Sequence, residues 1–348
     1  MADTIPTTSG TSDVAAQLRE MLATIRILPR RMLLDTPGVA ATIPMLRGVW
    51  GAALHDLDGE VYRRVFGPNE ESMPPRGARS RGLHEAVKWA AQREQRTRER
   101  ATLPRGQNTL VPSYVLRPAP PDPIFAPACD WILFGPAVAD DDVLRRAWDV
   151  ASGMGLGPER RRFHVRRTTV VQPDATLDDA GNPWTLDAAR PLLVDPVNPA
   201  RILGIADEQL AAITPCRLLF PAPLRIMFHG KLVQRPTLTD LVVAACRRIE
   251  SFLPAEQAAE WSALKREAIE LSRQVAATPW QGARLDLHRY SARQQTEIDL
   301  RGVTGSLDLP VGPGPLWPLL AAAQWLHLGK GTVMGLGQLW IASLHQAS

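Results

Sequence analysis

Two glycine-rich segments are the part of this chain best suited to chemistry on a phosphate. The tetrapeptide Met-Gly-Leu-Gly occurs at residues 154–157 and again at 334–337, each time between a predicted helix and a predicted strand. A helix, a glycine turn and a strand that occur twice indicate a duplicated unit. Because glycine permits positive φ and lets successive amides approach an anion, these loops could hold a phosphate.

Two side chains at the start of the second loop could act beside such a phosphate. Arginine outnumbers lysine 36 to 4 in this chain, so Lys330 is not explained by composition. Its ammonium could neutralise a phosphate beside the loop amides, although a solvated loop lysine is the alternative. His327 could transfer a proton, or it could cap and pack the end of the preceding helix. The glycines assigned to this site are Gly329, Gly331, Gly335 and Gly337.

Basic residues are concentrated in two blocks. Residues 76–105 carry nine Arg or Lys against three Glu, a net charge of +6 in a chain whose total is +4. Arg160, Arg161 and Arg162 follow the first glycine loop. Such blocks are typical of polyanion binding, but interleaved Arg and Glu are also typical of a solvated helix. Both interpretations stay open for the first block.

Composition sets the broad class. A length of 348 residues exceeds the usual size of one domain, so two are expected. Cys129, Cys216 and Cys246 lie far apart, which argues against a zinc knuckle or a disulfide framework and favours a reducing cytoplasm. No secretory signal is visible, and the longest apolar stretch, Leu316–Leu328, is too short to cross a bilayer. We expect a cytoplasmic protein without membrane contact.

Hydrophobic periodicity predicts a first unit over residues 15–172, after a loose tail at 1–14. Within this unit, residues 68–110 form an Arg-rich insertion, with a basic helix over Arg76–Arg100. The other expected elements are strands at Leu22–Leu28, Ser113–Arg117, Trp131–Phe134 and Arg162–Val171, and helices from Pro44 and over Asp140–Ser152.

A linker over residues 173–212, rich in Pro, Asp and Asn, is expected to lead to a second unit over 213–348. Its strands and helices alternate as strand, helix, strand, strand, helix, strand. This order predicts the ferredoxin-like fold of the α+β class, used twice in tandem, and such sheets commonly bind RNA. The expected elements are strands at Arg217–Phe220 and Leu224–His229 around a turn at Pro221–Pro223, helices at Leu238–Leu253 and Ala255–Val275, strands at Arg284–Tyr290 and Gly302–Leu309, a helix ending at His327, and a strand at Leu339–Ser343.

Several of these segments resemble one known family, the CRISPR-associated RAMP endoribonucleases, which cut precursor CRISPR RNA within its repeats. In the first unit, Leu46–Gly51 resembles the LRG segment of the family's first helix and Gly153–Gly157 its first glycine loop. Many relatives of this branch carry cysteines after the first helix, where this chain is Arg-rich. The C-terminal half carries the more specific resemblance, at Leu218–Ile226 with Gly230, Arg289–Gln295, Gly302–Gly305 and His327–Gly337.

The resemblance implies metal-independent cleavage without a cofactor. The ribose 2′-hydroxyl attacks the phosphorus and leaves a 2′,3′-cyclic phosphate, which requires a base, an acid and a cation near the phosphate. The resemblance places the catalytic histidine at His55, on the first helix, with Tyr62 two helical turns further to position or protonate. The alternative for His55 is an exposed histidine beside Asp56 and Asp58. A two-metal nuclease has little support, because the sequence shows no HExxH motif, clustered carboxylates or Cys/His ligand set.

The implied partner is CRISPR repeat RNA, as precursor and as mature guide RNA, together with other CRISPR effector subunits. Two alternatives remain: a RAMP subunit that holds guide RNA without cutting it, and an RNA-binding protein unrelated to CRISPR. Tyr290 would add one stacking face. The arginines expected to contact RNA are Arg47, Arg160, Arg161, Arg162, Arg225, Arg289 and Arg293.

Overall fold

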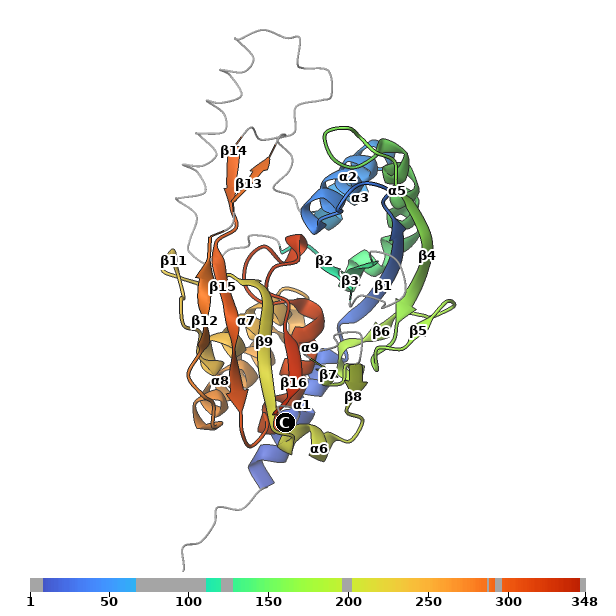
Figure 1. The fold of residues 1–348 in the computed structure, drawn as a ribbon. Coiled ribbons are helices and arrows are strands. Elements are labelled where there is room, and N and C mark those ends of the chain that lie inside the picture. The colour runs from blue at the N-terminus through green and yellow to red at the C-terminus, as the bar shows by residue number, and fades with distance from the viewer. Residues whose placement is uncertain are drawn as a thin grey trace, which may run out of the picture.

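The computed structural model describes residues 9–66, 111–119, 128–195, 202–286, 288–291 and 296–344 (Figure 1). For residues 9–12, 288–291 and 296–299 it describes the backbone only. The predicted basic helix at Arg76–Arg100 lies outside these ranges. Helices and strands of both described halves form two mainly antiparallel sheets with helices packed on them, so the chain is of the α+β class.

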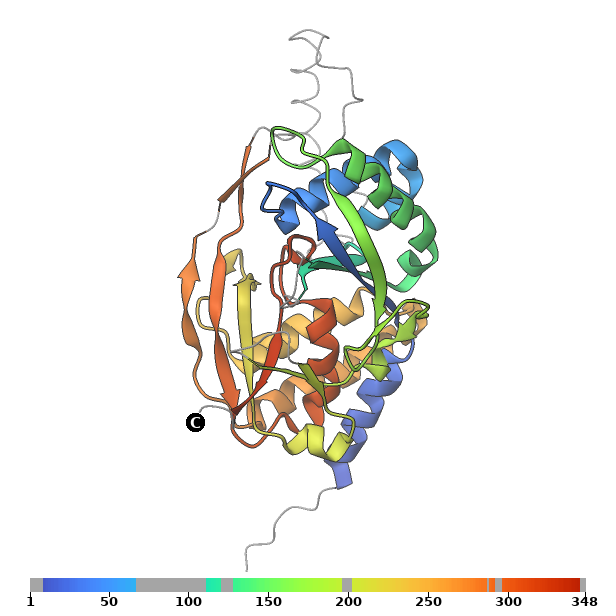
Figure 2. The same cartoon turned by 45° about the vertical axis from the view of Figure 1, so that its right-hand side comes forward.

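The first sheet has the strand order β2-β3-β1-β4, with every neighbouring pair antiparallel. Taken with the intervening helices, this is the ferredoxin-like arrangement. Thr42 caps α2 by accepting a hydrogen bond from the amide of Met45 (3.4 Å), and Pro44 lies in its first turn. Figure 2 shows α2, α3 and α5 together on the outer face of this sheet. The elements are β1 (Arg26–Asp35), α2 (Ile43–Leu57), α3 (Gly59–Phe66), β2 (Tyr114–Pro118), β3 (Ala128–Phe134), α5 (Asp141–Met154) and β4 (His164–Val171).

The second sheet repeats the arrangement with the order β12-β15-β9-β16. A capping box between Thr237 and Asp240 starts α7. Two short strands, β7 (Leu192–Val194) and β8 (Ile202–Gly204), extend this sheet beyond β16. The expected tandem ferredoxin-like fold is therefore confirmed. The elements are β9 (Cys216–Leu224), α7 (Leu238–Glu250), α8 (Ala258–Gln274), β12 (Gln281–Leu285), β15 (Gly302–Leu309), α9 (Trp317–Leu326) and β16 (Trp340–Ser343).

Short elements complete the described chain. Two of them are hairpins, β10 with β11 and β13 with β14, and each pair is antiparallel. Helix α6 precedes β9, and the 3-10 turns η4, η6 and η7 lie next to α1, α9 and the second glycine loop. Their bounds are β5 (Leu177–Asp178), β6 (Trp184–Thr185), η4 (Leu186–Ala188), α6 (Glu208–Ile213), β10 (Met227–Phe228), β11 (Lys231–Leu232), β13 (His288–Ser291), β14 (Thr296–Asp299), η6 (Gly314–Leu316) and η7 (Thr332–Met334).

Proline explains two of the expected boundaries that were wrong. The first strand starts at Arg26 and continues to Asp35. Pro29 lies between the residues of β1 that pair with β6 and those that pair with β4, so its missing N–H leaves no hydrogen bond unmade on that side of the strand. The expected turn at Pro221–Pro223 is part of β9. These prolines face the register shift between Val303 and Gly305 of β15, and such irregularities tolerate proline.

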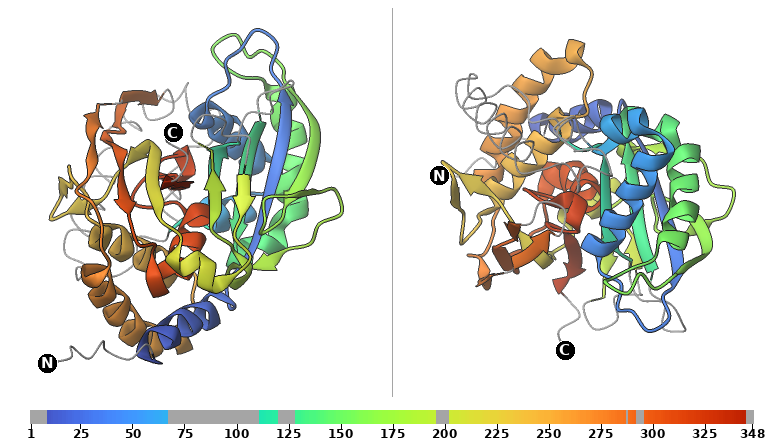
Figure 3. Two further views of the ribbon diagram at one scale, coloured as in Figure 1. Left: turned by 60° about the horizontal axis from the view of Figure 1, so that its bottom comes forward. Right: turned by 90° about the horizontal axis from the view of Figure 1, so that it is seen from above.

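The N-terminal helix α1 (Ser9–Leu22) begins within the stretch expected as a tail. Its buried face, including Val14 and Leu18, belongs to the second unit's hydrophobic core and contacts α8 and α9. Ile132 and Phe134 of the first sheet belong to the same core. Seen from below and from above, the C-terminal segment with α9 lies between the rest of the second unit and the first sheet (Figure 3). One face of the first sheet thus joins the second unit's core, while its other face packs against α2, α3 and α5 in a separate core.

Buried arginines join the two units at the C-terminal end of α9. Arg117 of β2 donates from Nη1 to the Gln324 carbonyl (2.8 Å), and Arg248 of α7 donates from Nε to the Leu326 carbonyl (3.2 Å). These carbonyls have no partner within a helix that ends here, so a cation satisfies them and complements the helix dipole. The Arg117 guanidinium also lies over the Trp325 ring, 5.0 Å from its centroid.

One buried carboxylate pairs with two arginines of the first sheet, Arg31 and Arg117. Asp130 is fully buried and accepts from Arg31 Nε (2.7 Å) and Arg117 Nε (3.0 Å). Burial alone would raise the pKa of Asp130, but the two guanidiniums outweigh it and hold the pKa below its usual value. Burial lowers the pKa of Arg117, and it lowers that of Arg248 to about 9. The junction depends on Asp130 staying ionised.

Replacing Asp130→Asn should lower the free energy of unfolding by about 3–5 kcal/mol, because it leaves two guanidiniums near no anion in a buried site. Urea unfolding at pH 7 measures the change. Asp179→Asn, which removes the exposed partner of Arg167, is the matched control and should leave stability unchanged. If the two variants were equally stable, the buried ion pairs of Asp130 would contribute no more to folding stability than the exposed pair of Asp179.

Candidate functional site

The second glycine loop requires its glycines for backbone geometry. Gly329, Gly331, Gly335 and Gly337 have φ of +79°, +83°, +80° and +68°. A Cβ at Gly337 would lie 1.9 Å from the Leu328 carbonyl oxygen, and one at Gly329 would lie 2.5 Å from that of Arg225. The predicted positive φ is therefore confirmed, and no other residue fits these two positions without displacing backbone.

Several amides of this loop already bond to carbonyls of the chain. Leu328 donates to Gly337 (2.9 Å), Gly337 to Pro223 (3.0 Å) and Lys330 to Arg225 (2.9 Å). Within the turn, Met334 donates to Gly331 at 2.8 Å. These amides hold the loop against β9 and cannot also face an anion. Of the residues assigned to a phosphate site, Lys330 is the one whose charged side chain is exposed.

His327 is fully buried at the end of α9, with a left-handed φ of +57°. Its Nδ1 lies 3.0 Å from the Leu336 carbonyl oxygen, so Nδ1 carries the proton of a neutral ring. Burial, reinforced by Arg117, lowers the His327 pKa to about 3. This environment favours the packing alternative for His327 over proton transfer.

His55 and Tyr62 lie together, as expected. The His55 side chain is 39% exposed in the last turn of α2, and its ring meets the Tyr62 ring edge-on with centroids 5.2 Å apart. They do not share a helix, because Asp58 ends α2 and caps α3 through the amides of Glu60 and Val61. Tyr62 is 2% exposed and stacks on Phe66, so it holds the His55 ring from a buried position.

Both glycine loops lie near the opposite end of α2. A Cβ at Gly335 would be 3.4 Å from Ile43, and one at Gly157 would be 3.6 Å from Met45. Ile43 and His55 are twelve residues apart on α2, which corresponds to about 18 Å of helix. The structure therefore does not gather His55 and the loop around one phosphate.

The arginines predicted to contact RNA differ in how exposed their side chains are and in the groups that they already bind. Arg47 is half-buried, donates to the Tyr114 hydroxyl (2.8 Å) and lies over Phe66. Arg161 bonds Glu159 (2.7 Å) and the Gly38 carbonyl (3.1 Å). Arg160 and Arg162 are exposed, and Arg225 is half-buried where its backbone bridges to Gly329. For Arg289 and Tyr290 in β13 only the backbone is described, and Arg293 lies outside the described residues.

Sequence reasoning missed the side chains that hold this frame. Gln324 bonds the Leu192 backbone twice, accepting from its amide and donating to its carbonyl, both at 2.9 Å. It is the one polar residue of the ten in α9, and a lone glutamine in an apolar helix was an available signal. Arg117 and Arg248 carried no comparable signal among 40 basic residues.

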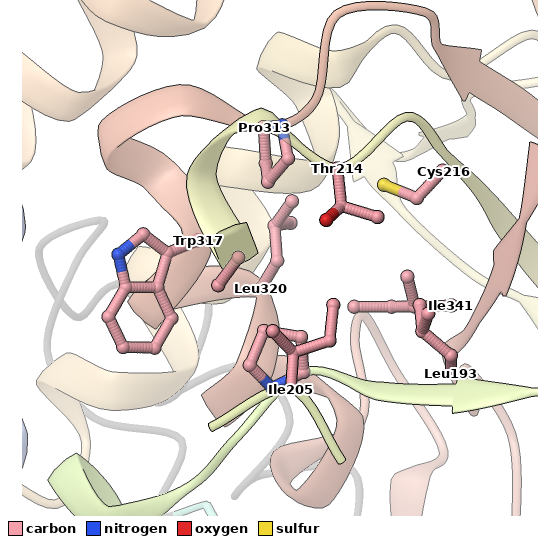
Figure 4. Close-up of a pocket in the computed structure, with 10 residues that line it drawn as sticks. Leu193, Ile205, Thr214, Cys216, Pro313, Trp317, Leu320 and Ile341 are labelled. Atoms are coloured by element: carbon pink, nitrogen blue, oxygen red, sulfur yellow. The ribbon is translucent and has the colours of Figure 1, made fainter. Parts of the chain in front are cut away.

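The apolar cavity next to α6 is too small for a nucleotide. This cavity of about 10 Å³ lies between α6, α9 and the sheet, lined by Ile205, Thr214, Cys216, Leu320 and others (Figure 4). This volume is at the lower limit for one water molecule. No group of three His, Cys, Asp or Glu in the described ranges is placed to hold a metal ion, and none of the described helices has the length and apolarity to span a membrane.

Comparison with known proteins identifies the C-terminal part. Residues 214–339 match the family model described as CRISPR-associated endoribonuclease Cas6. This match confirms, for that region, the resemblance to CRISPR-associated RAMP endoribonucleases. Among curated proteins, none matches the chain.

Solved structures of low identity cover most of the chain. Cas6 of Thermus thermophilus is 12% identical with a TM-score of 0.48, over 92% of this chain and 99% of that one. A Cas6-related protein from Pyrococcus furiosus is 8% identical with a TM-score of 0.39, over 90% and 98%. Because the identities and scores are this low, these structures carry no argument about activity.

The burial of His327 predicts a pH dependence of stability. The unfolded histidine binds a proton below its ordinary pKa of 6.5, whereas the folded one binds it only near pH 3. Stability that depends on the neutral ring is therefore lost as the pH falls from 6.5 toward 3. Wild type should lose up to about 1.4 kcal/mol per pH unit more than His327→Asn in this window. Urea unfolding at pH 7, 6 and 5 measures how the free energy of unfolding changes with pH in both proteins. The same pH dependence in both would contradict the lowered pKa of His327.

Proposed function

We propose that this chain is a metal-independent endoribonuclease that cuts CRISPR repeat RNA in precursor transcripts to give guide RNAs. The observation that carries the proposal is the family match over residues 214–339. It is supported by the exposed basic side chains around the two glycine loops, because cations that neutralise phosphates supply most of the affinity for RNA backbone. Residues 15–172 and 213–348 would each contribute one RNA-binding unit, joined by 173–212.

In this proposal, His55 transfers a proton during cleavage, as the general acid or the general base. It is the partly exposed member of the His55–Tyr62 pair, and histidine is the side chain used most often as a general acid or base. The buried Tyr62 ring fixes the His55 ring by packing, which makes it a positioning residue. The ribose 2′-hydroxyl attacks the adjacent phosphorus, the 5′-oxygen leaves with a proton, and a 2′,3′-cyclic phosphate remains.

Lys330 and the arginines would hold the RNA backbone away from the scissile bond. The separation of about 18 Å along α2 between His55 and the loop contact is longer than one nucleotide, so the two places would contact different nucleotides. One RNA strand could thus contact both places at once. Other CRISPR effector subunits would bind the product complex.

A second candidate function is a RAMP subunit that holds guide RNA without cutting it. The same separation favours it, because neither Lys330 nor the buried His327 completes a catalytic group around His55. In that case the Cas6-type region binds RNA and the His55–Tyr62 pair is only part of the helix surface.

Cleavage of the repeat RNA encoded by the same genome, assayed in EDTA, separates the two candidates. The nuclease proposal expects cutting that persists in EDTA, stops with a 2′-deoxy sugar at the scissile nucleotide, and slows by about 10²–10⁴-fold in His55→Ala. His164→Ala is the matched control, since His164 is an exposed histidine on β4. Tight binding without cutting by the wild type would leave the guide-holding subunit.

A further inference from the structure

The β10–β11 hairpin presents an aromatic pair to solvent. Among the large apolar side chains that the described part of the chain exposes, Phe228 is the only aromatic one, at 65% exposed. The His229 ring meets it nearly edge-on, with centroids 4.3 Å apart. Figure 1 shows β11 at the outer margin of the second unit. Neither ring is needed to fill the core.

The turn between the two strands is not optimised for folding alone. His229 and Gly230 have φ of +46° and +78°, the left-handed pair of a tight two-residue hairpin turn. Asn-Gly is the sequence that favours this turn most, because asparagine tolerates positive φ better than other residues with a Cβ. A histidine at this position adds an exposed aromatic ring at a conformational cost.

The charged residues of the hairpin segment itself are all basic. Phe228 pairs with Lys231 across the hairpin, so both side chains project from the same face of the ribbon. From residue 218 to 239 the chain carries Arg225, Lys231 and Arg235 and no acidic residue. An exposed ring on a segment whose charges are all basic suits a group that is aromatic and anionic.

Main-chain hydrogen bonds tie the hairpin to the second glycine loop. The Val233 amide donates to the Ile226 carbonyl (2.9 Å), and the next carbonyl toward β9, that of Arg225, accepts from Lys330 (2.9 Å). Two of the four lysines of the chain, Lys231 and Lys330, therefore lie on connected segments. The hairpin has a fixed place next to a cationic loop.

We propose that Phe228 and His229 stack an unpaired base of bound RNA while Lys231 contacts a neighbouring phosphate. An apolar docking surface for a protein would extend over several side chains, whereas here one aromatic pair stands among cations. Nucleotides combine a flat ring with a phosphate and match this arrangement. The inference rests on the proposed RNA-binding function and adds a contact remote from His55.

Equilibrium binding of fluorescein-labelled repeat RNA to the full chain tests the stacking contact. Phe228→Ala and Phe228→Leu should weaken binding by about 5- to 150-fold, the range for one stacked base, whereas Phe228→Trp should retain wild-type affinity. Lys231→Ala should lower the slope of log K against log salt by about 0.7–0.9. Leu203→Ala, at an exposed apolar residue of β8 (68% exposed), is the control and should bind like wild type.

Cross-linking gives a readout that altered folding cannot imitate. Repeat RNA carrying 5-iodouridine should cross-link to the peptide containing Phe228 in the wild type and lose that cross-link in Phe228→Leu. Unchanged affinity of Phe228→Ala, or cross-links that map only elsewhere, would overturn the inference and leave the proposed function standing. Failure of the wild type to bind repeat RNA would overturn both.

Discussion

The end of helix α9 is the point on which the rest of the structure depends. Its last carbonyls are buried and accept hydrogen bonds from Arg117 of the first unit and from Arg248 of the second, while Asp130 keeps the first arginine charged and oriented. Removing one charge from such a cluster costs far more than an exposed ion pair does. Because the glycine loop begins where this helix ends, the junction also sets where Lys330 and the β10–β11 hairpin lie relative to the first unit.

The second glycine loop and the His55–Tyr62 pair each hold an exposed side chain on a rigid support. In the loop, positive φ at four glycines and the backbone hydrogen bonds to β9 create a fixed platform from which the exposed lysine projects. In the first unit, a break between α2 and α3 brings Tyr62 against His55, so a buried ring orients a partly exposed one. Both sites place one solvent-accessible group on a support held by backbone hydrogen bonds or by ring packing, which limits reorganisation when a ligand binds.

The sequence predicted the fold well because its signals were local. Strand and helix periodicity, the proline at the start of α2 and the Thr237 cap located most elements, and their order predicted both ferredoxin-like units. The strands at Pro29 and Pro221 were bounded wrongly. A proline fits inside a strand only where the neighbouring strand is not paired with it or is irregular, and this depends on the packing of segments far apart in sequence. The site was harder to predict. Helical spacing predicted His55 and Tyr62 close together, but they meet across the break at Asp58 and not along one helix. The burial of His327 and the use of loop amides depend on contacts between residues far apart in sequence.

Native-state hydrogen exchange, followed peptide by peptide, tests most directly the claim that the α9 junction makes the two units one folding body. Slowly exchanging amides of β3 in the first unit and β9 in the second should open with the same free energy, and that common value should split in a variant whose junction is broken at Arg117. Different opening free energies for the two strands in the unaltered chain would contradict the claim, because the units would then be folding independently and the junction could not position one against the other.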